Sequence, residues 1–192
     1  MKKIVIIQGH PYKESFNAAL AAAYKKGALA AGAEVREIVI ADLQFNPNLQ
    51  YGFSKRMELE PDLLKAWEAI QWADHQVWVH PVWWGGLPAL TKGFIDRLFL
   101  PGMAFKYREN SVWWDKLLTG KTAHIITTLD QPRWYYWLAF GAPSVNQLKK
   151  SILGFCGVKV QHTTYVGPIR KSKEGFRQRE LQRIEESGKS MR

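Results

Sequence analysis

Residues 9–17, GHPYKESFN, contain side-chain and backbone groups that can bind an anion. Ser15 is a suitable helix-capping residue, and Phe16 and Asn17 would open that helix, where unpaired N–H groups and the positive dipole end favour a phosphate. His10 can add a further donor to the same anion. The alternative interpretation is that Ser15 is an ordinary N-cap and His10 a solvated loop residue. The segment lacks the GxGxxG and GxxxxGK[ST] patterns of dinucleotide-binding and P-loop sites.

A second candidate loop combines tryptophans with glycines. It begins with Pro81 and Val82 and continues with Trp83, Trp84 and Gly85 within the sequence PVWWGGL. Glycine lets the backbone approach a flat ligand while an aromatic face covers that ligand, and this arrangement suits an isoalloxazine ring. The alternative interpretation places both tryptophans in the core or at a subunit interface.

A third candidate loop follows a stretch that ends with two hydroxyl side chains. Thr127 and Thr128 come first, and the aromatic run WYYW, which includes Tyr135 and Tyr136, follows Pro132. A tyrosine in this loop can hydrogen-bond a flavin edge or shape an aromatic slot above it. Packing against a second subunit is the alternative, and it is equally compatible with the sequence.

Other reaction classes lack their signatures. The five histidines show neither i, i+4 pairing nor an HExxH motif, so we expect no zinc hydrolase and no metal site. The absence of GxSxG argues against an α/β-hydrolase. The one cysteine, Cys156, cannot form an intrachain disulfide and is interpreted as a buried packing residue.

The elements that precede the three loops must position them. Short β-branched stretches predict five strands, at 3–8, 35–40, 76–80, 122–128 and 159–166. Apolar spacing and end signals predict helices at 17–31, 61–72, 89–100, 144–155 and 174–187. Strands that alternate with helices predict an α/β domain with a parallel sheet and right-handed crossovers.

Five strands in a chain of this length fit a flavodoxin-like three-layer sandwich, with a parallel sheet of order 2-1-3-4-5. Residues 1–192 are predicted to form one domain. In such a sheet, ligands bind beyond the carboxyl ends of the strands where the strand order reverses, so the three loops should converge. Residues 101–121, which contain Trp113 and Trp114, are expected to form an excursion over this active edge.

Composition bounds the class of protein. Of 192 residues, 46% are hydrophobic, which is enough for a sizeable core and excludes wholesale disorder. The apolar run after the first lysines is too short for a signal peptide or a membrane span, so we expect a cytoplasmic protein without membrane insertion. The net charge of +10 is compatible with nucleic acid, an anionic membrane surface, a phosphate-bearing ligand or no partner. Interleaved basic and acidic residues in 170–192 favour a solvated helix over nucleic-acid binding.

These segments resemble a known family, the flavodoxin-like NAD(P)H:quinone oxidoreductases of the mammalian DT-diaphorase type and their bacterial relatives. In order along the chain, the resemblance is carried by GHPYKESFN, FNP, PVWWGGLPALTKGFIDRLF, GMAFKY, TT and FCG. Residues 81–107 form the most specific of these segments, and together the segments cover nearly the whole chain.

The resemblance implies a noncovalent flavin, either FAD or FMN, that NAD(P)H reduces and a quinone or similar flat acceptor reoxidises. The cycle would be ping-pong, with hydride passing through flavin N5. The resemblance also implies a homodimer with the site at the subunit interface. It assigns the phosphate portion to the first loop, the ring to the second and the polar edge of the ring to the third, with these binding residues: His10, Ser15, Phe16, Asn17, Pro81, Val82, Trp83, Trp84, Gly85, Thr127 and Thr128.

The chain departs from the family pattern after the fourth predicted strand. The mammalian enzymes carry TTGG there, whereas this sequence reads TTLDQP. They also place a tyrosine and a histidine near the flavin. Tyr135 and Tyr136 are the candidates for that catalytic tyrosine, but no histidine lies between His124 and His162, so backbone N–H groups would have to stabilise the reduced ring. An alternative function is a flavin-binding ancillary subunit of a membrane transport system with little turnover of its own.

Overall fold

Five parallel strands form the centre of the molecule in the computed structural model, which describes residues 1–191. They are β1 (Lys3–Gln8), β2 (Glu34–Val39), β3 (His75–Pro81), β6 (Thr122–Thr128) and β7 (Lys159–Val166). Their order in the sheet, β2-β1-β3-β6-β7, is the predicted 2-1-3-4-5 order. All seven residues of β3 are buried, because a central parallel strand is covered on both faces. The predicted flavodoxin-like fold is confirmed.

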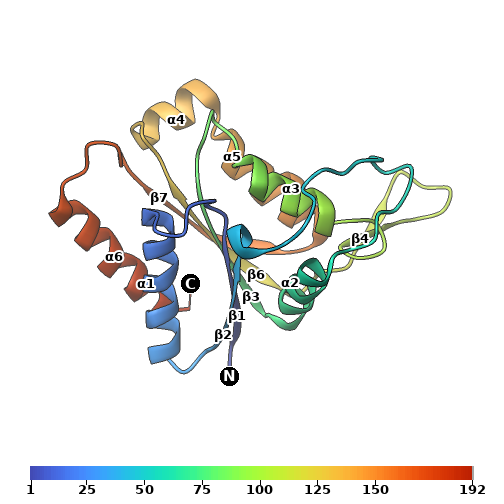
Figure 1. The fold of residues 1–192 in the computed structure, drawn as a ribbon, viewed down its shortest axis with the longest axis horizontal. Helices are drawn as coiled ribbons and strands as arrows, with labels where there is room; N and C mark the ends of the chain where they lie inside the picture. Colours follow the sequence, from blue (N-terminus) through green and yellow to red (C-terminus); the bar gives the residue numbers. More distant parts are fainter. Residues whose placement is uncertain (192) are drawn as a thin grey trace.

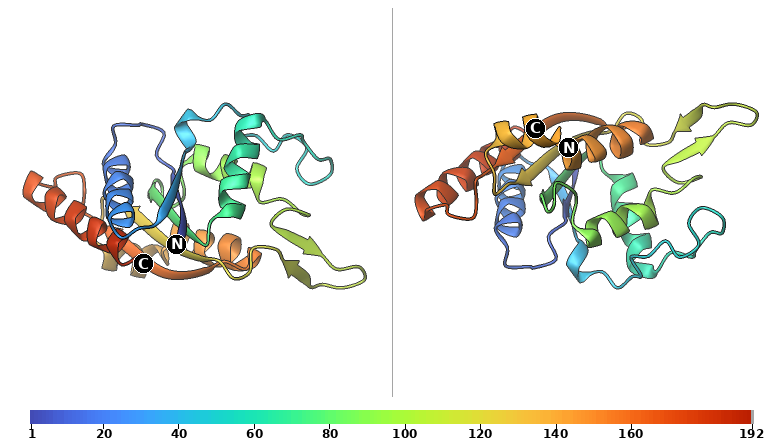
Figure 2. Two further views of the ribbon diagram at one scale, coloured as in Figure 1. Left: turned by 90° about the horizontal axis from the view of Figure 1, so that it is seen from below. Right: turned by 90° about the horizontal axis from the view of Figure 1, so that it is seen from above.

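Helices cover both faces of this sheet, which gives the molecule three layers (Figures 1 and 2). Side chains alternate along β1, so Ile4 and Ile6 pack on the helices α1 (Phe16–Ala30) and α6 (Glu174–Lys189), whereas Val5 and Ile7 face the other helices. A short 3-10 turn, η1, follows β2, and the π-helix η2 continues directly from α5. The bounds are α1 (Phe16–Ala30), η1 (Ile40–Asp42), α2 (Pro61–Trp72), α3 (Ala89–Leu98), α5 (Pro143–Asn146), η2 (Gln147–Gly154) and α6 (Glu174–Lys189).

Helices α1 and α6 approach each other backbone to backbone. A Cβ atom at Gly27 would lie 2.0 Å from the carbonyl oxygen of Glu185, and one at Gly188 would lie 2.2 Å from the carbonyl oxygen of Tyr24. Only glycine permits this spacing, because every other residue carries a Cβ. Apart from Gly188, Ile184 is the one buried residue of α6. Helix α6 is therefore held in place mainly by its close packing against α1.

The expectation that residues 101–121 form an excursion over the active edge stays a prediction. These residues contain a hairpin of two short antiparallel strands, β4 (Phe105–Tyr107) and β5 (Trp114–Lys116). Trp114 stacks on Phe155 with 4.1 Å between ring centroids, and its Nε1 donates to the Phe155 carbonyl at 2.9 Å. Phe155 lies shortly before β7, so this aromatic pair fixes the hairpin at the amino end of that strand. The adjacent Cys156 is buried, as predicted, and burial raises the pKa of its thiol to about 12.

The structure contains a helix that the sequence did not predict, α4 (Arg133–Phe140), directly after the third candidate loop. Pro132 precedes it, and Gly141 ends it with a φ of 68°. Tyr136 is the one buried residue among its eight, and the helix stands at the top of the molecule in Figure 1. Within residues 1–191, no helix combines the length and the apolar character needed to cross a membrane.

Candidate functional site

The three candidate loops meet at the carboxyl edge of the sheet, where the strand order reverses between β1 and β3. One hollow of about 180 Å³ is lined by His10, Ser15, Phe16, Asn17, Pro81, Val82, Trp83, Thr128, Leu129, Asp130 and Ile169. A larger cleft of about 570 Å³ is lined by Val82, Trp83, Trp84, Gly85, Leu129, Asp130, Gln131, Phe140 and Pro143. Val82 and Trp83 line both hollows, so the two are adjoining parts of one candidate site.

The first loop presents the start of helix α1 to the smaller hollow. Ser15 is the N-cap of this helix, as predicted, and its hydroxyl oxygen accepts from the N–H of Ala18 at 3.2 Å. The N–H groups of Phe16 and Asn17 come before this bonded group and have no acceptor within the helix. Both N–H groups lie at the positive end of the helix dipole, where an anion such as phosphate is stabilised.

His10 connects the first loop to the second. Its Nδ1 accepts a hydrogen bond from the N–H of Tyr12 at 2.9 Å, so the neutral ring carries its proton on Nε2. The ring meets Trp83 edge-on, with 5.4 Å between centroids. Burial lowers the pKa of His10 below its ordinary value. At neutral pH, His10 is therefore an uncharged N–H donor beside the helix start.

The second loop folds into a tight turn over residues 83–86. Trp83 and Gly86 exchange two backbone hydrogen bonds of 2.8 and 3.1 Å. Between them, Trp84 and Gly85 have φ angles of 51° and 77°. Such angles are routine for glycine and uncommon for tryptophan. The turn thus holds the fully exposed side chain of Trp84 in a strained conformation at the mouth of the larger cleft.

Buried hydrogen bonds fix this turn. The Tyr136 hydroxyl donates to the carbonyl oxygen of Gly85 at 3.1 Å and accepts from the N–H of Ser144 at 3.1 Å. The same N–H also donates to the Gly85 carbonyl at 3.0 Å. Tyr136 has no exposed surface and Tyr135 is partly exposed on α4, and neither side chain lines the two hollows. The catalytic roles suggested for both tyrosines stay predictions.

The two threonines of the third loop occupy different positions. The Asn17 side-chain amide donates to Thr128 Oγ1 at 3.0 Å, which joins the third loop to the first. The N–H of Val82 donates to the Thr128 carbonyl at 2.9 Å, which joins it to the second. Thr127 is wholly buried, and its Oγ1 lies 3.5 Å from Nδ1 of His80. Thr127 therefore lies beneath the site, and Thr128 borders it.

Three buried polar side chains near this edge keep atoms without a partner among residues 1–191. They are the amide of Gln8 and Nε2 of His80, at the ends of neighbouring strands, and Oγ of Ser144, beside the turn of the second loop. Burial lowers the pKa of His80 to about 4, so its ring is neutral. Together with the N–H donors of the first loop and the aromatic turn of the second, these groups fit a ligand with an anionic tail and a flat polar-edged ring. A flavin has these parts.

Sequence reasoning missed several residues that line the site, among them Asp130, Phe140, Pro143 and Ile169. Phe140 and Pro143 lie at and just after the end of α4. The signals that could have predicted this helix are Pro132 before it and Gly141 after it. Ile169 arrives from the segment after β7, where its N–H donates to the Leu129 carbonyl at 2.9 Å. This contact joins distant parts of the chain and leaves no local pattern.

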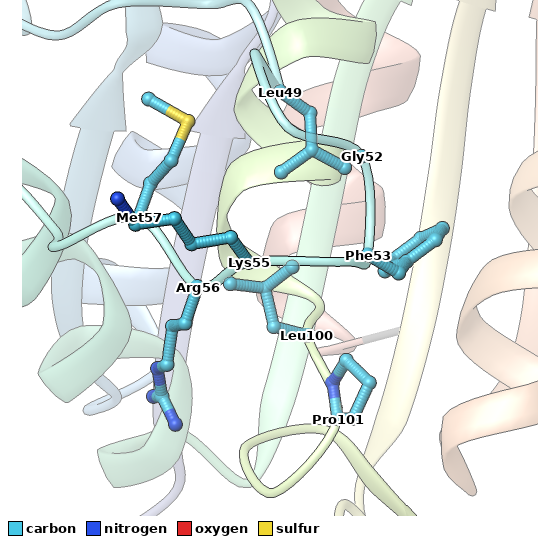
Figure 3. A pocket seen from close by; sticks show the side chains of 8 residues that line it. All are labelled: Leu49, Gly52, Phe53, Lys55, Arg56, Met57, Leu100 and Pro101. Atoms are coloured by element: carbon cyan, nitrogen blue, oxygen red, sulfur yellow. The ribbon is translucent and has the colours of Figure 1, made fainter.

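A separate hollow of about 150 Å³ lies away from these loops (Figure 3). Its lining side chains, such as Phe53 and Arg56, extend in different directions in Figure 3. Leu100 and Pro101 follow the end of α3, whereas the second candidate loop precedes its start, so about 15 Å of helix separates the two places. The lining residues are Leu49, Gly52, Phe53, Lys55, Arg56, Met57, Leu100 and Pro101.

Several known proteins have sequences similar to that of this chain. Rat NAD(P)H dehydrogenase (quinone) 1 is 27% identical over 185 residues, which cover 83% of this chain and 66% of the rat protein. An FMN-dependent NADH:quinone oxidoreductase of Caldicellulosiruptor bescii is 39% identical over 89 residues, which cover 45% of this chain and 42% of that protein. The chain thus spans two thirds or less of the length of these relatives.

The likeness extends to solved structures. The crystal structure of Smu.1420 from Streptococcus mutans UA159 superposes with a TM-score of 0.80 at 30% identity, covering 99% of this chain and all of that one. A family model described as the flavodoxin-like fold matches residues 2–187. Because this match spans nearly the whole chain and the strand order agrees with it, the chain belongs to the flavodoxin-like fold family.

Proposed function

We propose that this protein is a flavin-dependent NAD(P)H:quinone oxidoreductase and that its flavin is FMN. The observation that carries the proposal is the convergence of a phosphate-binding helix start, an aromatic turn and a polar strand end on one edge of the sheet. The names of the rat and Caldicellulosiruptor relatives support the reaction class, and the name of the latter supports FMN.

The residues of the smaller hollow would hold the phosphate of the flavin. Nε2 of His10 and the N–H groups of Phe16 and Asn17 supply donors at the positive end of α1. A dianionic phosphate beside His10 would favour the protonated ring and so raise the pKa that burial lowers.

The residues of the larger cleft would hold the ring. Trp83 and Gly85 would approach its face, and Thr128, which lines the adjoining smaller hollow and is fixed by Asn17, would border its polar edge. The bound flavin supplies the hydride chemistry. The chain orients the ring through the turn that Tyr136 fixes, and aromatic side chains around the cleft limit the access of water. We propose Tyr136 as a positioning residue, and Tyr135, on the exposed side of the same helix, as a candidate for contact with the acceptor.

Two further expectations from the sequence remain part of this proposal. A homodimer would complete the site from a second subunit. A reducing compartment such as the cytoplasm fits the single buried thiol of Cys156.

The first test is the visible absorption spectrum of the purified protein, followed by chromatography of any ligand that heat releases. We expect the bands of an oxidised flavin, bleached by NADH or NADPH and restored by a quinone. A protein that stays colourless and also rejects added FMN and FAD would contradict the proposal.

A matched pair of ligands tests the phosphate site separately. FMN and riboflavin differ only in the phosphate, so His10→Ala should weaken FMN binding about fivefold to tenfold and leave riboflavin binding unchanged. Quenching of flavin fluorescence measures both dissociation constants. His162→Ala, an exposed histidine on β7, is the control. An equal effect of His10→Ala on the two ligands would contradict the assignment of His10 to the phosphate.

A further inference from the structure

Helix α4 carries a concentration of exposed apolar side chains that its own domain leaves uncovered. A helix that packs on a globular core normally buries an apolar stripe, whereas α4 buries Tyr136 alone. Apolar patches of this kind mark surfaces that bind a partner or a membrane. The exposed members are Trp134, Tyr135, Trp137, Leu138 and Phe140.

Cationic side chains surround the base of this helix. Arg133 opens α4, which contains no acidic residue. Residues 167–173, GPIRKSK, contain three cations and no acidic residue. This segment is tied beside α4, because the N–H of Arg170 donates to the side chain of Asp130 at 3.0 Å. Figure 1 shows α4 and the segment between β7 and α6 at the same end of the molecule. Asp130 accepts this hydrogen bond from the backbone of Arg170, and the next acidic residue along the chain is Glu174, the first residue of α6.

We propose that α4 and residues 167–173 together form a docking surface for an anionic lipid bilayer, with α4 lying in the interface between headgroups and acyl chains. Tryptophan and tyrosine combine an apolar ring with a polar atom, and they concentrate at this depth of a membrane. A helix in the interface buries its apolar side chains about 5–10 Å into the boundary. The flanking cations then meet anionic headgroups.

Charge favours a bilayer over a second copy of the chain as the occupant of this surface. In a two-fold dimer with this surface on the symmetry axis, the cationic segment of one copy would approach that of the other. Residues 167–173 and α4 offer no acidic group to compensate this repulsion. The exposed side chains also leave α4 on several sides, since Trp134, Tyr135, Trp137 and Leu138 are consecutive apart from Tyr136. A fluid interface accommodates such a shape better than a flat protein face.

The surface adjoins the candidate site. Phe140 belongs to α4 and lines the larger cleft together with Trp84. An apolar acceptor dissolved in lipid would therefore reach the cleft from the docked face. Lipid binding itself does not depend on the proposed oxidoreductase activity, because it is measured without flavin or electron donor.

Sedimentation with lipid vesicles tests the proposal on the full chain. We expect the protein to bind vesicles of phosphatidylcholine mixed equally with phosphatidylglycerol, and to bind pure phosphatidylcholine more weakly. The double variant Trp134→Ser/Leu138→Ser should lower the affinity about tenfold or more. Val112→Ser/Trp113→Ser is the matched control, because its side chains are 86% and 64% exposed, against 64% and 78% for Trp134 and Leu138.

A second variant separates charge from apolar contact. Arg170→Gln/Lys171→Gln should weaken binding to the mixed vesicles and leave binding to pure phosphatidylcholine unchanged. The variant keeps the backbone N–H of residue 170 that donates to Asp130, so the segment should stay beside α4. The proposal is overturned if the wild-type protein fails to bind either vesicle, or if both double variants bind as it does. It is also overturned if light scattering shows that Trp134→Ser/Leu138→Ser splits a dimer, since a second copy would then cover α4.

Discussion

The hydroxyl of Tyr136 is a single group whose removal tests how the candidate site is held in shape. Tyr136→Phe deletes one hydrogen bond to the Gly85 carbonyl and one from the Ser144 N–H, each 3.1 Å long. A buried hydrogen bond contributes about 0.5–1.5 kcal/mol net. Two such bonds together contribute about 1–3 kcal/mol. The two backbone groups keep their own 3.0 Å hydrogen bond, so neither is left without a partner, and we expect a loss near the lower end of this sum, about 1 kcal/mol. For a domain of this size, that loss lowers Tm by about 2–4 °C.

The same change should loosen the turn that would hold the flavin ring. If flavin binding must then supply the same free energy, about 1 kcal/mol, to order the turn, the flavin Kd rises about fivefold. Calorimetry measures Tm, and fluorescence quenching measures Kd. Tyr135→Phe, on the exposed side of α4, should leave Tm unchanged within about 1 °C. An unchanged Tm and Kd in Tyr136→Phe would refute the positioning role, and a fall in kcat alone would favour direct catalysis.

Three further perturbations follow from buried groups. Burial lowers the pKa of His80 to about 4 and that of His75 to about 3, so as pH falls below about 6.5 the unfolded chain takes up protons before the folded chain does. At pH near 5, each histidine should therefore lower the free energy of unfolding by about 2 kcal/mol. In urea unfolding, His80→Gln should lose less stability than the wild type between neutral and acidic pH. Arg97 is wholly buried and donates to both carboxylate oxygens of Glu60 at 3.1 and 2.8 Å; Arg97→Met should cost about 3 kcal/mol, and a urea midpoint equal to that of the wild type would contradict this. Gly27→Ala places a Cβ 2.0 Å from a backbone oxygen of α6 and should cost about 2 kcal/mol, with faster hydrogen exchange confined at first to α6.

The sheet could be predicted because its signal is local. The β-branched run in residues 3–8 and the run in 122–128 each end at a strand boundary that the structure reproduces, since a strand covered on both faces is rich in apolar and β-branched residues. Helix α4 could not be predicted in the same way. Its side chains are exposed on nearly all sides, so the apolar periodicity on which a helix prediction depends is missing.

In the candidate site, too, some features could be predicted from local sequence and others could not. The three loops and most of their residues follow from the rule that parallel strands gather their carboxyl ends at one edge. The contacts that hold the site do not, because the Asn17 to Thr128 hydrogen bond and the Tyr136 contact with Gly85 join residues far apart in the chain. The packing of residues 101–121 could not be predicted for a related reason: the partner of Trp114 is Phe155, and nothing in the segment itself indicates it.

The glycine contact between α1 and α6 also bears on how the molecule is made. Its two sides are about 160 positions apart in the chain, a separation that makes contact formation slow. While the chain emerges from the ribosome, α1 and the sheet face beneath it can form early, but Gly27 meets its partner only after residues 174–189 have been synthesised. Until then, the outer side of α1 is open to water and to other nascent chains. Helix α6 therefore covers α1 only late in synthesis, and truncation within α6 should leave an aggregation-prone intermediate.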